Sequence, residues 1–432
     1  MGNAVEAVES YLAVARAGAV GAFLNPSAST SELAYMLDDS GAELLLVDPE
    51  RREQISAGVD VVATDGAFEE LARSAGPTPP DDLDLDAPAW MLYTSGTTGR
   101  PKGVLLSQRS CLWVVAACWA PVLDLRPDEE LLSALPLFHS YALDLTVVAV
   151  VATGARLRLL PRFSSARAIS TLREEPVSLF AGVPTMFHYL VQELDGEPLR
   201  AERLRLCVSA GAILPGSLTE AFEQVAGVPL LDGYGITETS TMVTMNWPTG
   251  DRPPGSCGLP LPGCAVRLVD AGTGADVEPE EEGELIVRGP QVMLGYHNRP
   301  DDTAEAVRDG WYHTGDLARA DRNGYLTITG RIKELIIRGG ENIAPAEVEQ
   351  AIVEHPAVTD AAVVGRPDEA LGEVVAAFVV AAEGTPEADE LRTFAADRLA
   401  EFKVPAEFHF VDEIPRTGSG KVMRHRLVEL LA

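Results

Sequence analysis

Strand-like apolar runs alternate with segments of helical spacing between residues 90 and 231, and this alternation restricts the fold more than any other feature. Helices fit between the later strands, at Pro184–Glu193 and Leu218–Val225. Alternation of this kind is typical of a parallel sheet in an α/β fold. The strand candidates are Trp90–Tyr93, Arg156–Leu160, Leu179–Ala181, Leu204–Ser209 and Val228–Leu231.

The N-terminal region is predicted to run helix, helix, strand before this alternation begins. Val5–Ala17 has helical spacing, and Ser29 with Glu32 makes a capping box for a second helix. Glu43–Val47 is a strand candidate, and the proline- and aspartate-rich stretch Gly76–Pro88 is predicted to be a solvated linker.

The pattern changes after Pro253, where short β runs and turns replace the alternation. A smaller α+β unit then follows Gly330. The sequence predicts an α/β protein with a large N-terminal domain, residues 1–330, made of α/β subdomains and a β-rich subdomain. A small mobile α+β C-terminal domain, residues 331–432, completes the prediction. The elements behind it are Cys264–Val269, Gly283–Val287, Gly324–Ile328, Ala346–Glu354, Ala361–Val364, Val374–Val380 and Asp389–Leu399.

Composition excludes several function classes. The formal net charge of −31 disfavours nucleic acid and anionic membranes as partners, because both require basic surfaces. No run approaches the ~20 apolar residues of a membrane span. The first helix carries Glu6 and Glu9 without a basic leader, so it does not resemble a secretory signal. The five cysteines show no CxxC spacing, which favours free thiols and a cytoplasmic location.

Lysine is rare in this chain, which uses arginine for nearly all its positive charge. A protein with few incidental lysines makes each of them a candidate for a task that needs a compact ammonium. The alternative is that they are ordinary surface residues. The four lysines are Lys102, Lys333, Lys403 and Lys421.

The segment Tyr93-Thr-Ser-Gly-Thr-Thr-Gly-Arg-Pro-Lys-Gly103 has the composition of a phosphate-binding loop. Glycine lets the backbone approach a phosphate closely, hydroxyls and N–H groups donate to its oxygens, and Lys102 supplies charge. The spacing is not that of a Walker A loop. An ordinary Ser/Thr/Gly turn is the alternative.

This loop resembles the phosphate loop of the adenylate-forming superfamily, which includes acyl-CoA synthetases, aryl-CoA ligases, luciferases and peptide-synthetase adenylation domains. Four further motifs resemble those of the family and occur in the family's order. They are Asp232-Gly-Tyr-Gly-Ile-Thr-Glu238, Gly310-Trp-Tyr-His-Thr-Gly-Asp316, Gly330-Arg-Ile-Lys-Glu-Leu-Ile337 with Gly339-Gly-Glu-Asn342, and Pro415-Arg-Thr-Gly-Ser-Gly-Lys421.

The resemblance implies an ATP site. Tyr234, between two glycines that leave room for a purine, would stack on adenine, and Asp232 would accept from its amino group. Thr237 would donate to the α-phosphate, and Glu238 would hold Mg²⁺. The residues implied to bind ATP are Thr94, Ser95, Gly96, Thr97, Thr98, Gly99, Lys102, Gly211, Ala212, Asp232, Gly233, Tyr234, Gly235, Thr237, Asp316 and Arg331.

The resemblance also implies two successive half-reactions. Lys421 would reach the carboxylate and the α-phosphate during adenylation, and Lys333 matches the hinge about which the small domain turns. Lys403 falls outside the motifs, so a structural role is predicted for it. Coenzyme A would then approach along the thioester loop of Gly339, Gly340 and Glu341.

His139 matches a histidine at the edge of the family's acid pocket, where it would steer the carboxylate or gate the thiol. A plain hydrogen-bonded histidine is the alternative. The segment Phe180–Met186 is similar to malonate-type ligases, but Tyr189 and Gly233 stand where those carry arginines. An uncharged pocket predicts a monocarboxylic acid, a fatty acid first and an aryl acid second. The predicted acyl pocket comprises Tyr141, Val183, Met186, Ala210 and Ile236.

Three alternatives accompany the predicted acyl-CoA synthetase. An acyl carrier protein could replace coenzyme A as acceptor, although Gly339–Asn342 resembles acyl-CoA synthetases more than peptide-synthetase domains. A luciferase-like oxidation is another. Gly2–Pro26 resembles a stretch that lies some way into typical members, so we expect the usual first N-terminal segment to be missing. A non-catalytic nucleotide-binding relative is therefore the alternative from another functional class.

Overall fold

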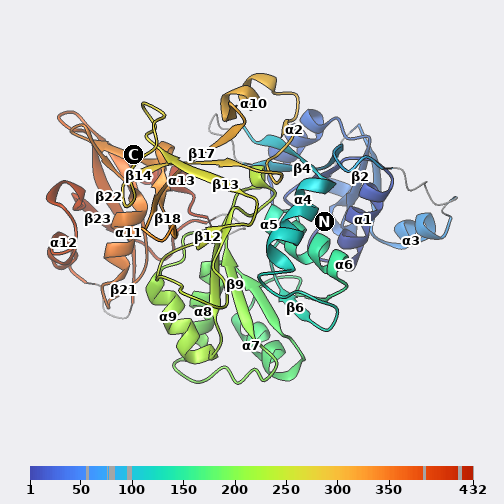
Figure 1. Ribbon diagram of the computed structural model, residues 1–432, viewed down its shortest axis with the longest axis horizontal. Coiled ribbons are helices and arrows are strands. Elements are labelled where there is room, and N and C mark those ends of the chain that lie inside the picture. The colour runs from blue at the N-terminus through green and yellow to red at the C-terminus, as the bar shows by residue number, and fades with distance from the viewer. Residues whose placement is uncertain are drawn as a thin grey trace. The chain divides into compact units, whose positions relative to one another are not determined.

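The computed structural model describes residues 1–54, 58–74, 76, 83–94, 100–382, 386–416 and 421–431 (Figure 1). The chain divides into two compact units, Met1–Ala265 with Val287–Tyr312 and Val266–Ile286 with His313–Ala432. The predicted mixed α/β fold is confirmed. The hinge boundary at residue 330 and the mobility of the small domain stay predictions.

The larger unit contains a seven-stranded sheet in the order β12-β11-β10-β9-β8-β6-β7. Its five strands from β10 to β7 pair in parallel, as is typical of an α/β alternation. Four of them match predicted strands, whereas β6 was not predicted and the candidate Trp90–Tyr93 lies in the second sheet of this unit. Helices α7, α8 and α9 connect them, and α8 packs against both α7 and α9. The bounds are β6 Glu130–Ser133, β7 Arg156–Leu159, α7 Ser165–Glu174, β8 Leu179–Gly182, α8 Pro184–Leu194, β9 Leu206–Ala210, α9 Gly216–Ala226, β10 Leu230–Tyr234, β11 Thr244–Met245 and β12 Leu259–Pro260.

A second sheet in this unit has the order β1-β4-β5-β15 and carries the predicted phosphate loop between β4 and β5. The predicted capping box at Ser29 and Glu32 is present at the start of α2. The bounds are α1 Val5–Arg16, β1 Gly21–Phe23, α2 Thr30–Ser40, β2 Leu44–Val47, η1 Pro49–Gln54, β3 Asp60–Ala63, α3 Gly66–Arg73, β4 Pro88–Thr94, β5 Lys102–Ser107, β15 Gly295–Tyr296, α10 Pro300–Ala306 and β16 Val307–Arg308.

Two helical segments, residues 108–119 and 140–153, were not predicted, because most of their residues are apolar and leave only a weak amphipathic pattern. Both contain π-helical turns, η2 and η3, which pack against each other. The predicted start of one strand was also wrong. The strand was predicted to begin at Gly324, but β18 begins at Leu326, because Gly324 has a φ of 88° and lies in the preceding turn. The missed elements are α4 Gln108–Val114, η2 Val115–Trp119, α5 Ser140–Ala142, η3 Leu143–Ala149 and α6 Val150–Thr153.

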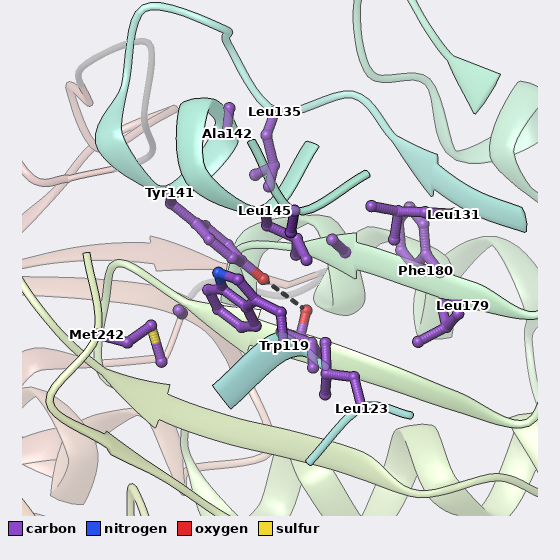
Figure 2. Packing of buried hydrophobic residues seen from close by; sticks show 14 of the residues in the cluster. Trp119, Leu123, Leu131, Leu135, Tyr141, Ala142, Leu145, Leu179, Phe180 and Met242 are labelled. Atoms are coloured by element: carbon purple, nitrogen blue, oxygen red, sulfur yellow. Dashed lines mark hydrogen bonds between the residues drawn. The ribbon is translucent and has the colours of Figure 1, made fainter. Parts of the chain in front are cut away.

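The main core of the larger unit lies where these helices meet the seven-stranded sheet. Figure 2 shows Trp119 and Tyr141 close together, with Leu145 beside them and Phe180 from strand β8 nearby. Trp119, Leu145 and Phe180 are fully buried. The five cysteines are free thiols, as predicted.

The smaller unit begins with β strands and continues into a sheet of order β20-β19-β22-β21, with β23 beside β22. Its core includes Ile336, Ile343, Val363 and Val375. The bounds are β13 Ala265–Val269, β14 Glu282–Arg288, β17 Trp311–Ala320, β18 Leu326–Arg331, η5 Ile332–Glu334, β19 Ile336–Arg338, β20 Glu341–Ile343, α11 Pro345–Val353, β21 Val358–Asp368, β22 Gly372–Ala381, α12 Ala388–Ala396, η6 Glu401–Lys403, β23 Glu407–Phe410 and α13 Arg424–Glu429.

Within the described part of the chain, no helix combines the length and the apolar character needed to cross a bilayer.

Candidate active site

The two described ends of the predicted phosphate loop lie opposite each other. Strand β4 ends at Thr94, strand β5 begins at Lys102, and the two residues pair in the antiparallel register. This pairing fixes the points at which the chain leaves and re-enters the sheet. The remaining predicted loop residues, Ser95, Gly96, Thr97, Thr98 and Gly99, lie outside the described residues.

A hydrogen-bond network clamps both ends of this loop to helix α2. Before the loop, the Tyr93 hydroxyl donates to Asp39 Oδ2 at 3.0 Å. After it, the Tyr35 hydroxyl donates to the carbonyl of Pro101 at 2.9 Å. Arg299 joins the two halves, since its Nη2 donates to the Tyr35 oxygen at 2.8 Å and to Asp39 Oδ1 at 3.0 Å. Burial and the nearby Asp39 carboxylate raise the pKa of Tyr93, which keeps it a donor.

Lys102 is held by two partners. Its ammonium lies 3.1 Å from a carboxylate oxygen of Asp302 and 5.1 Å from the centre of the Tyr296 ring. The lysine side chain is only 16% exposed. A largely buried ammonium therefore stands directly at the end of the predicted phosphate loop.

Thr237 and Glu238 occupy a short 3₁₀ turn, Thr237–Thr239, directly after β10. The Thr237 hydroxyl lies 3.5 Å from that of Ser140. The next two residues, Ser240 and Thr241, have left-handed φ values of 46° and 90°. Such strain persists only where the surrounding structure enforces it, and it is frequent at functional sites.

The Glu238 carboxylate lies beside two phenols. The Tyr296 hydroxyl donates to Glu238 Oε1 at 3.1 Å, and the Tyr312 hydroxyl lies 3.4 Å from that of Tyr296. Burial, followed by the Glu238 charge, raises the pKa of both tyrosines. Both phenols therefore stay protonated and can donate. Sequence reasoning missed them, because nothing in a single sequence links positions this far apart.

The glycines beside Tyr234 serve the protein's own packing. A Cβ at Gly235 would lie 1.5 Å from the carbonyl oxygen of Thr241, and one at Gly233 would lie 2.4 Å from Met242 Cε. The sequence interpretation, that these glycines leave room for a purine, therefore needs correction. They let the strained turn fold back against β10.

Asp232 lies within β10, next to the strand β9 that Gly211 and Ala212 follow. Asp232 on β10 pairs in register with Ser209 on β9, and Gly211 and Ala212 follow directly after β9. Burial raises the pKa of Asp232 well above its usual range. Carboxyl ends of parallel strands at a sheet edge are common ligand sites in α/β folds.

The predicted acyl-pocket residues belong to the larger unit, and most are buried. The Tyr141 hydroxyl donates to the carbonyl of Val208 at 3.2 Å, the dashed line in Figure 2, and its ring stacks on Trp119. His139 is half-buried at the start of α5, with its ring against Phe138. Val183, Met186 and Ala210 are buried, and Ile236 is partly buried.

One titratable residue behind Tyr141 was not predicted. Asp144 in η3 is 1% exposed, and its Oδ1 accepts the Trp119 indole N–H at 2.8 Å. Burial raises the pKa of Asp144 well above its usual range. Its Oδ2 has no hydrogen-bond partner among the described residues.

In the smaller unit, Asp316 and Arg331 form an ion pair across β17 and β18. Arg331 Nε lies 2.8 Å from Asp316 Oδ1, and the two residues are direct partners in the ladder. The Thr314 hydroxyl accepts from the Asp316 N–H at 3.0 Å and donates to the carbonyl of Leu285 at 2.6 Å. The carboxylate of Asp316, one of the predicted ATP-binding residues, thus has a fixed position.

The predicted thioester loop is a tight β-hairpin between β19 and β20. Gly339 and Gly340 have φ values of 60° and 91°, and Arg338 pairs with Glu341 across the turn. Two consecutive positive φ values define the hairpin turn that favours Gly-Gly. Nothing lies within 4 Å of a Cβ built on Gly340, so its backbone is open to an approaching chain.

The remaining lysines differ in their surroundings. Lys403 Nζ lies 2.7 Å from both carboxylate oxygens of Glu347, which supports the structural role predicted for it. Lys333 is exposed in the 3₁₀ turn Ile332–Glu334. Lys421 is exposed next to Val422, which forms an isolated bridge with Arg416. The loop residues 417–420 lie outside the described residues.

The donor set around Glu238 fits a hard cation that is shared with phosphates. Among the described residues, no group of three or more His, Cys, Asp or Glu side chains could hold a metal alone. Glu238 instead offers carboxylate oxygens, with the Thr237 and Ser140 hydroxyls nearby. Mg²⁺ is commonly bound by one or two carboxylates together with substrate phosphates.

Sequence profiles of known families match most of the chain. The profile of the AMP-binding enzyme matches residues 1–297, and that of the AMP-binding enzyme C-terminal domain matches residues 347–421. The chain belongs to the AMP-binding enzyme family. This membership confirms the resemblance drawn from the five motifs.

Curated relatives include several acid–CoA ligases. A long-chain-fatty-acid–CoA ligase of Bacillus subtilis (strain 168) is 39% identical over 79% of this chain and 61% of its own length. A feruloyl-CoA synthase of an Amycolatopsis species is 38% identical over 96% of this chain and 85% of its own. The chain is therefore an enzyme of the acyl-CoA ligase group.

Solved structures are also similar to this chain over nearly its whole length. ATP-bound MatB from Rhodopseudomonas palustris superposes with a TM-score of 0.94 at 33% identity, covering 100% of this chain and 87% of that one. O-succinylbenzoate coenzyme A synthetase (MenE) from Bacillus subtilis, in complex with ATP and magnesium ion, gives 0.87 at 34% identity over 99% and 87%.

Proposed function

We propose that this chain activates a monocarboxylic acid with ATP as an acyl-adenylate and then forms the coenzyme A thioester. The observation that carries this proposal is the joint position of Lys102 and Glu238, which share Tyr296 as a neighbour. One end of the phosphate loop and a carboxylate suited to Mg²⁺ thereby face one site. Membership in the acyl-CoA ligase group supports the assignment.

In the first half-reaction, a carboxylate oxygen attacks the α-phosphorus, and pyrophosphate leaves with the bridging oxygen. Lys102 would neutralise the phosphates, and Thr237 would donate to the α-phosphate. Asp316 would accept from the ribose hydroxyls. Mg²⁺, held by Glu238 when bound, would supply charge neutralisation at the phosphates. Lys421 would stabilise the charge that develops between the acid and the α-phosphate, a contribution of ~10²–10³ in rate.

In the second half-reaction, the thiol of coenzyme A attacks the acyl carbonyl, and AMP leaves as the carbon–oxygen bond breaks. The thiol proton is released during this step. The Gly339–Gly340 turn would line the thiol's path, since its backbone is open. A turn of the smaller domain at Lys333 would exchange Lys421 for this loop.

The acid that we propose is an apolar monocarboxylate, a fatty acid first and an aryl acid second. Tyr189 and Gly233 are the positions where a dicarboxylate ligase would need cations. Tyr189 is 54% exposed on α8, and the space beside Gly233 is filled by Met242 and Met245. A second carboxylate buried beside Gly233 without a partner would carry a penalty of several kcal/mol.

Carboxylate-dependent ATP–pyrophosphate exchange tests the proposal directly. A panel of acetate, octanoate, palmitate, benzoate, coumarate and malonate would show octanoate or palmitate highest, with the aryl acids next. Mass spectrometry with coenzyme A added would then show the acyl-CoA product. Exchange with malonate as best substrate would refute the uncharged pocket. A thioester formed only on an acyl carrier protein would replace coenzyme A as acceptor.

A further inference from the structure

A short segment of chain ties the Glu238 turn to the strand that follows the phosphate loop. The Met293 N–H donates to the carbonyl of Glu238 at 2.8 Å. Three residues later, Tyr296 pairs with Val104 in the β15–β5 ladder, and its hydroxyl donates to the Glu238 carboxylate at 3.1 Å. Glu238 is therefore held at its backbone and at its side chain by the same segment.

The direction of the hydrogen bonds between the phenols follows from counting protons. A phenol has one proton to donate, and that of Tyr296 goes to the Glu238 carboxylate. The 3.4 Å contact between the two hydroxyls then requires Tyr312 to donate to Tyr296. Tyr312 is 4% exposed, so burial keeps its hydroxyl in place. The resulting chain runs from Tyr312 through Tyr296 to Glu238.

The aromatic ring of Tyr296 also contacts Lys102. Its ammonium lies 5.1 Å from the Tyr296 ring centre, and Asp302 holds it from another direction at 3.1 Å. The backbone of Tyr296 is fixed independently of its side chain, because its N–H donates to Thr303 Oγ1 at 2.9 Å. One aromatic residue thus contacts both charged groups of the proposed ATP site.

We propose that Tyr296 is a positioning residue that sets the Glu238 carboxylate and the Lys102 ammonium at a fixed separation matched to magnesium-bound ATP. The hydroxyl, supported by Tyr312, orients the carboxylate toward the cation, and the ring seats the ammonium. This inference rests on the proposed function of the site. It adds residues outside the predicted nucleotide-binding set.

The test separates the hydroxyl from the ring by calorimetric titration of ATP, with Mg²⁺ and with EDTA. Tyr296→Phe keeps the ring and should raise the Kd of magnesium-bound ATP about tenfold, the range of one hydrogen bond to a charged group. Its Kd for ATP in EDTA should stay unchanged. Tyr296→Leu should also weaken ATP in EDTA, about threefold, since it removes the cation–π contact. Tyr312→Phe should shift only the magnesium-dependent affinity, by a smaller factor.

Tyr325→Phe in the smaller unit is the matched control, because the Tyr325 hydroxyl has no hydrogen-bond partner among the described residues. This variant should bind ATP like wild type. Thermal melting of each variant checks that it is folded. If Tyr296→Phe melts at a clearly lower temperature than wild type, the affinities of Tyr312→Phe test the inference instead. Equal weakening of ATP with and without Mg²⁺, or no weakening in either phenylalanine variant, would overturn the inference. Wild-type protein that binds magnesium-bound ATP but catalyses no exchange would sink only the proposed function.

Discussion

Asp316 and Arg331 lie directly opposite each other in the β17–β18 ladder and form an ion pair at 2.8 Å. The Asp316 side chain is 5% exposed, whereas that of Arg331 is 46% exposed. A carboxylate this buried needs a compensating charge, and the arginine supplies it from the surface side. The pair therefore fixes the position of the Asp316 carboxylate.

Asp316→Asn should remove the preference for the ribose hydroxyls. Wild-type protein should bind 2′,3′-dideoxy-ATP roughly 10–100-fold more weakly than ATP, since hydrogen bonds to a charged acceptor contribute ~1.5–3 kcal/mol. The variant should bind the two nucleotides with similar affinity. Calorimetry on both proteins measures the difference. A variant that keeps the wild-type ratio would contradict the ribose role.

Lys421→Ala should lose adenylation by ~10²–10³ in rate while keeping thioester formation from a supplied acyl-adenylate. Only the first half-reaction needs an ammonium beside the reacting phosphate. Rapid-quench measurements of each half-reaction separate the two. Lys403→Ala is the control, because the Lys403 ammonium pairs with Glu347 away from the predicted motifs. This variant should leave both rates unchanged. Equal losses in both half-reactions would rule out the assigned role.

Lys333→Pro should show the opposite pattern. Proline fixes φ near −65° and removes the N–H, so it should obstruct a turn of the smaller domain. Thioester formation should fall at least tenfold, while adenylation changes less. Lys333→Ala, which removes the charge but keeps a flexible backbone, should behave like wild type in the same assays. The hinge proposal fails if the proline variant turns over at the normal rate.

Asp39→Ala should destabilise the larger unit by about 2–3 kcal/mol, because it leaves Tyr93 and Arg299 without their shared acceptor. The Asp39 side chain is 12% exposed. Asp86→Ala makes a fair comparison, since Asp86 pairs with Arg109 while both side chains are more than half exposed. An ion pair this exposed to solvent should contribute far less to stability than the Asp39 contacts. Urea unfolding of both variants gives their free energies of unfolding. Equal losses would show that Asp39 does not hold the ends of the phosphate loop more firmly than an exposed ion pair would.

Asp144→Asn should change how stability depends on pH. Burial raises the folded-state pKa of Asp144 well above the ordinary range of an aspartate. A group with a raised folded pKa contributes stability below the unfolded pKa and loses it as pH rises toward the folded one. Wild-type protein should therefore lose stability relative to the variant from about pH 4 upward. Asparagine still accepts from Trp119, so melting temperatures at several pH values should diverge steadily. Parallel curves would show that Asp144 is ionised in the folded state.

The sequence by itself determined the class of fold and the family. Strand and helix periods repeat locally, so the parallel α/β character followed from the alternation, and the Ser29–Glu32 box followed from nearby residues. The order of the strands and the strand β6 came only from the structure. Motifs such as Tyr93–Gly103 carry their chemistry within a few residues. The buried π-helical segments were missed because a mostly apolar run gives only a weak periodic pattern.

Only the tertiary structure decided how the site is held. Tyr296 lies 58 residues beyond Glu238, yet its hydroxyl reaches that carboxylate. Arg299 lies 260 residues beyond Asp39, which it contacts at 3.0 Å. Sheet pairing and core packing create these neighbours, and neither leaves a local pattern in the chain. The chemistry of each side chain can be read from the sequence one residue at a time. The distance between two charged groups depends instead on where the whole fold places their backbones.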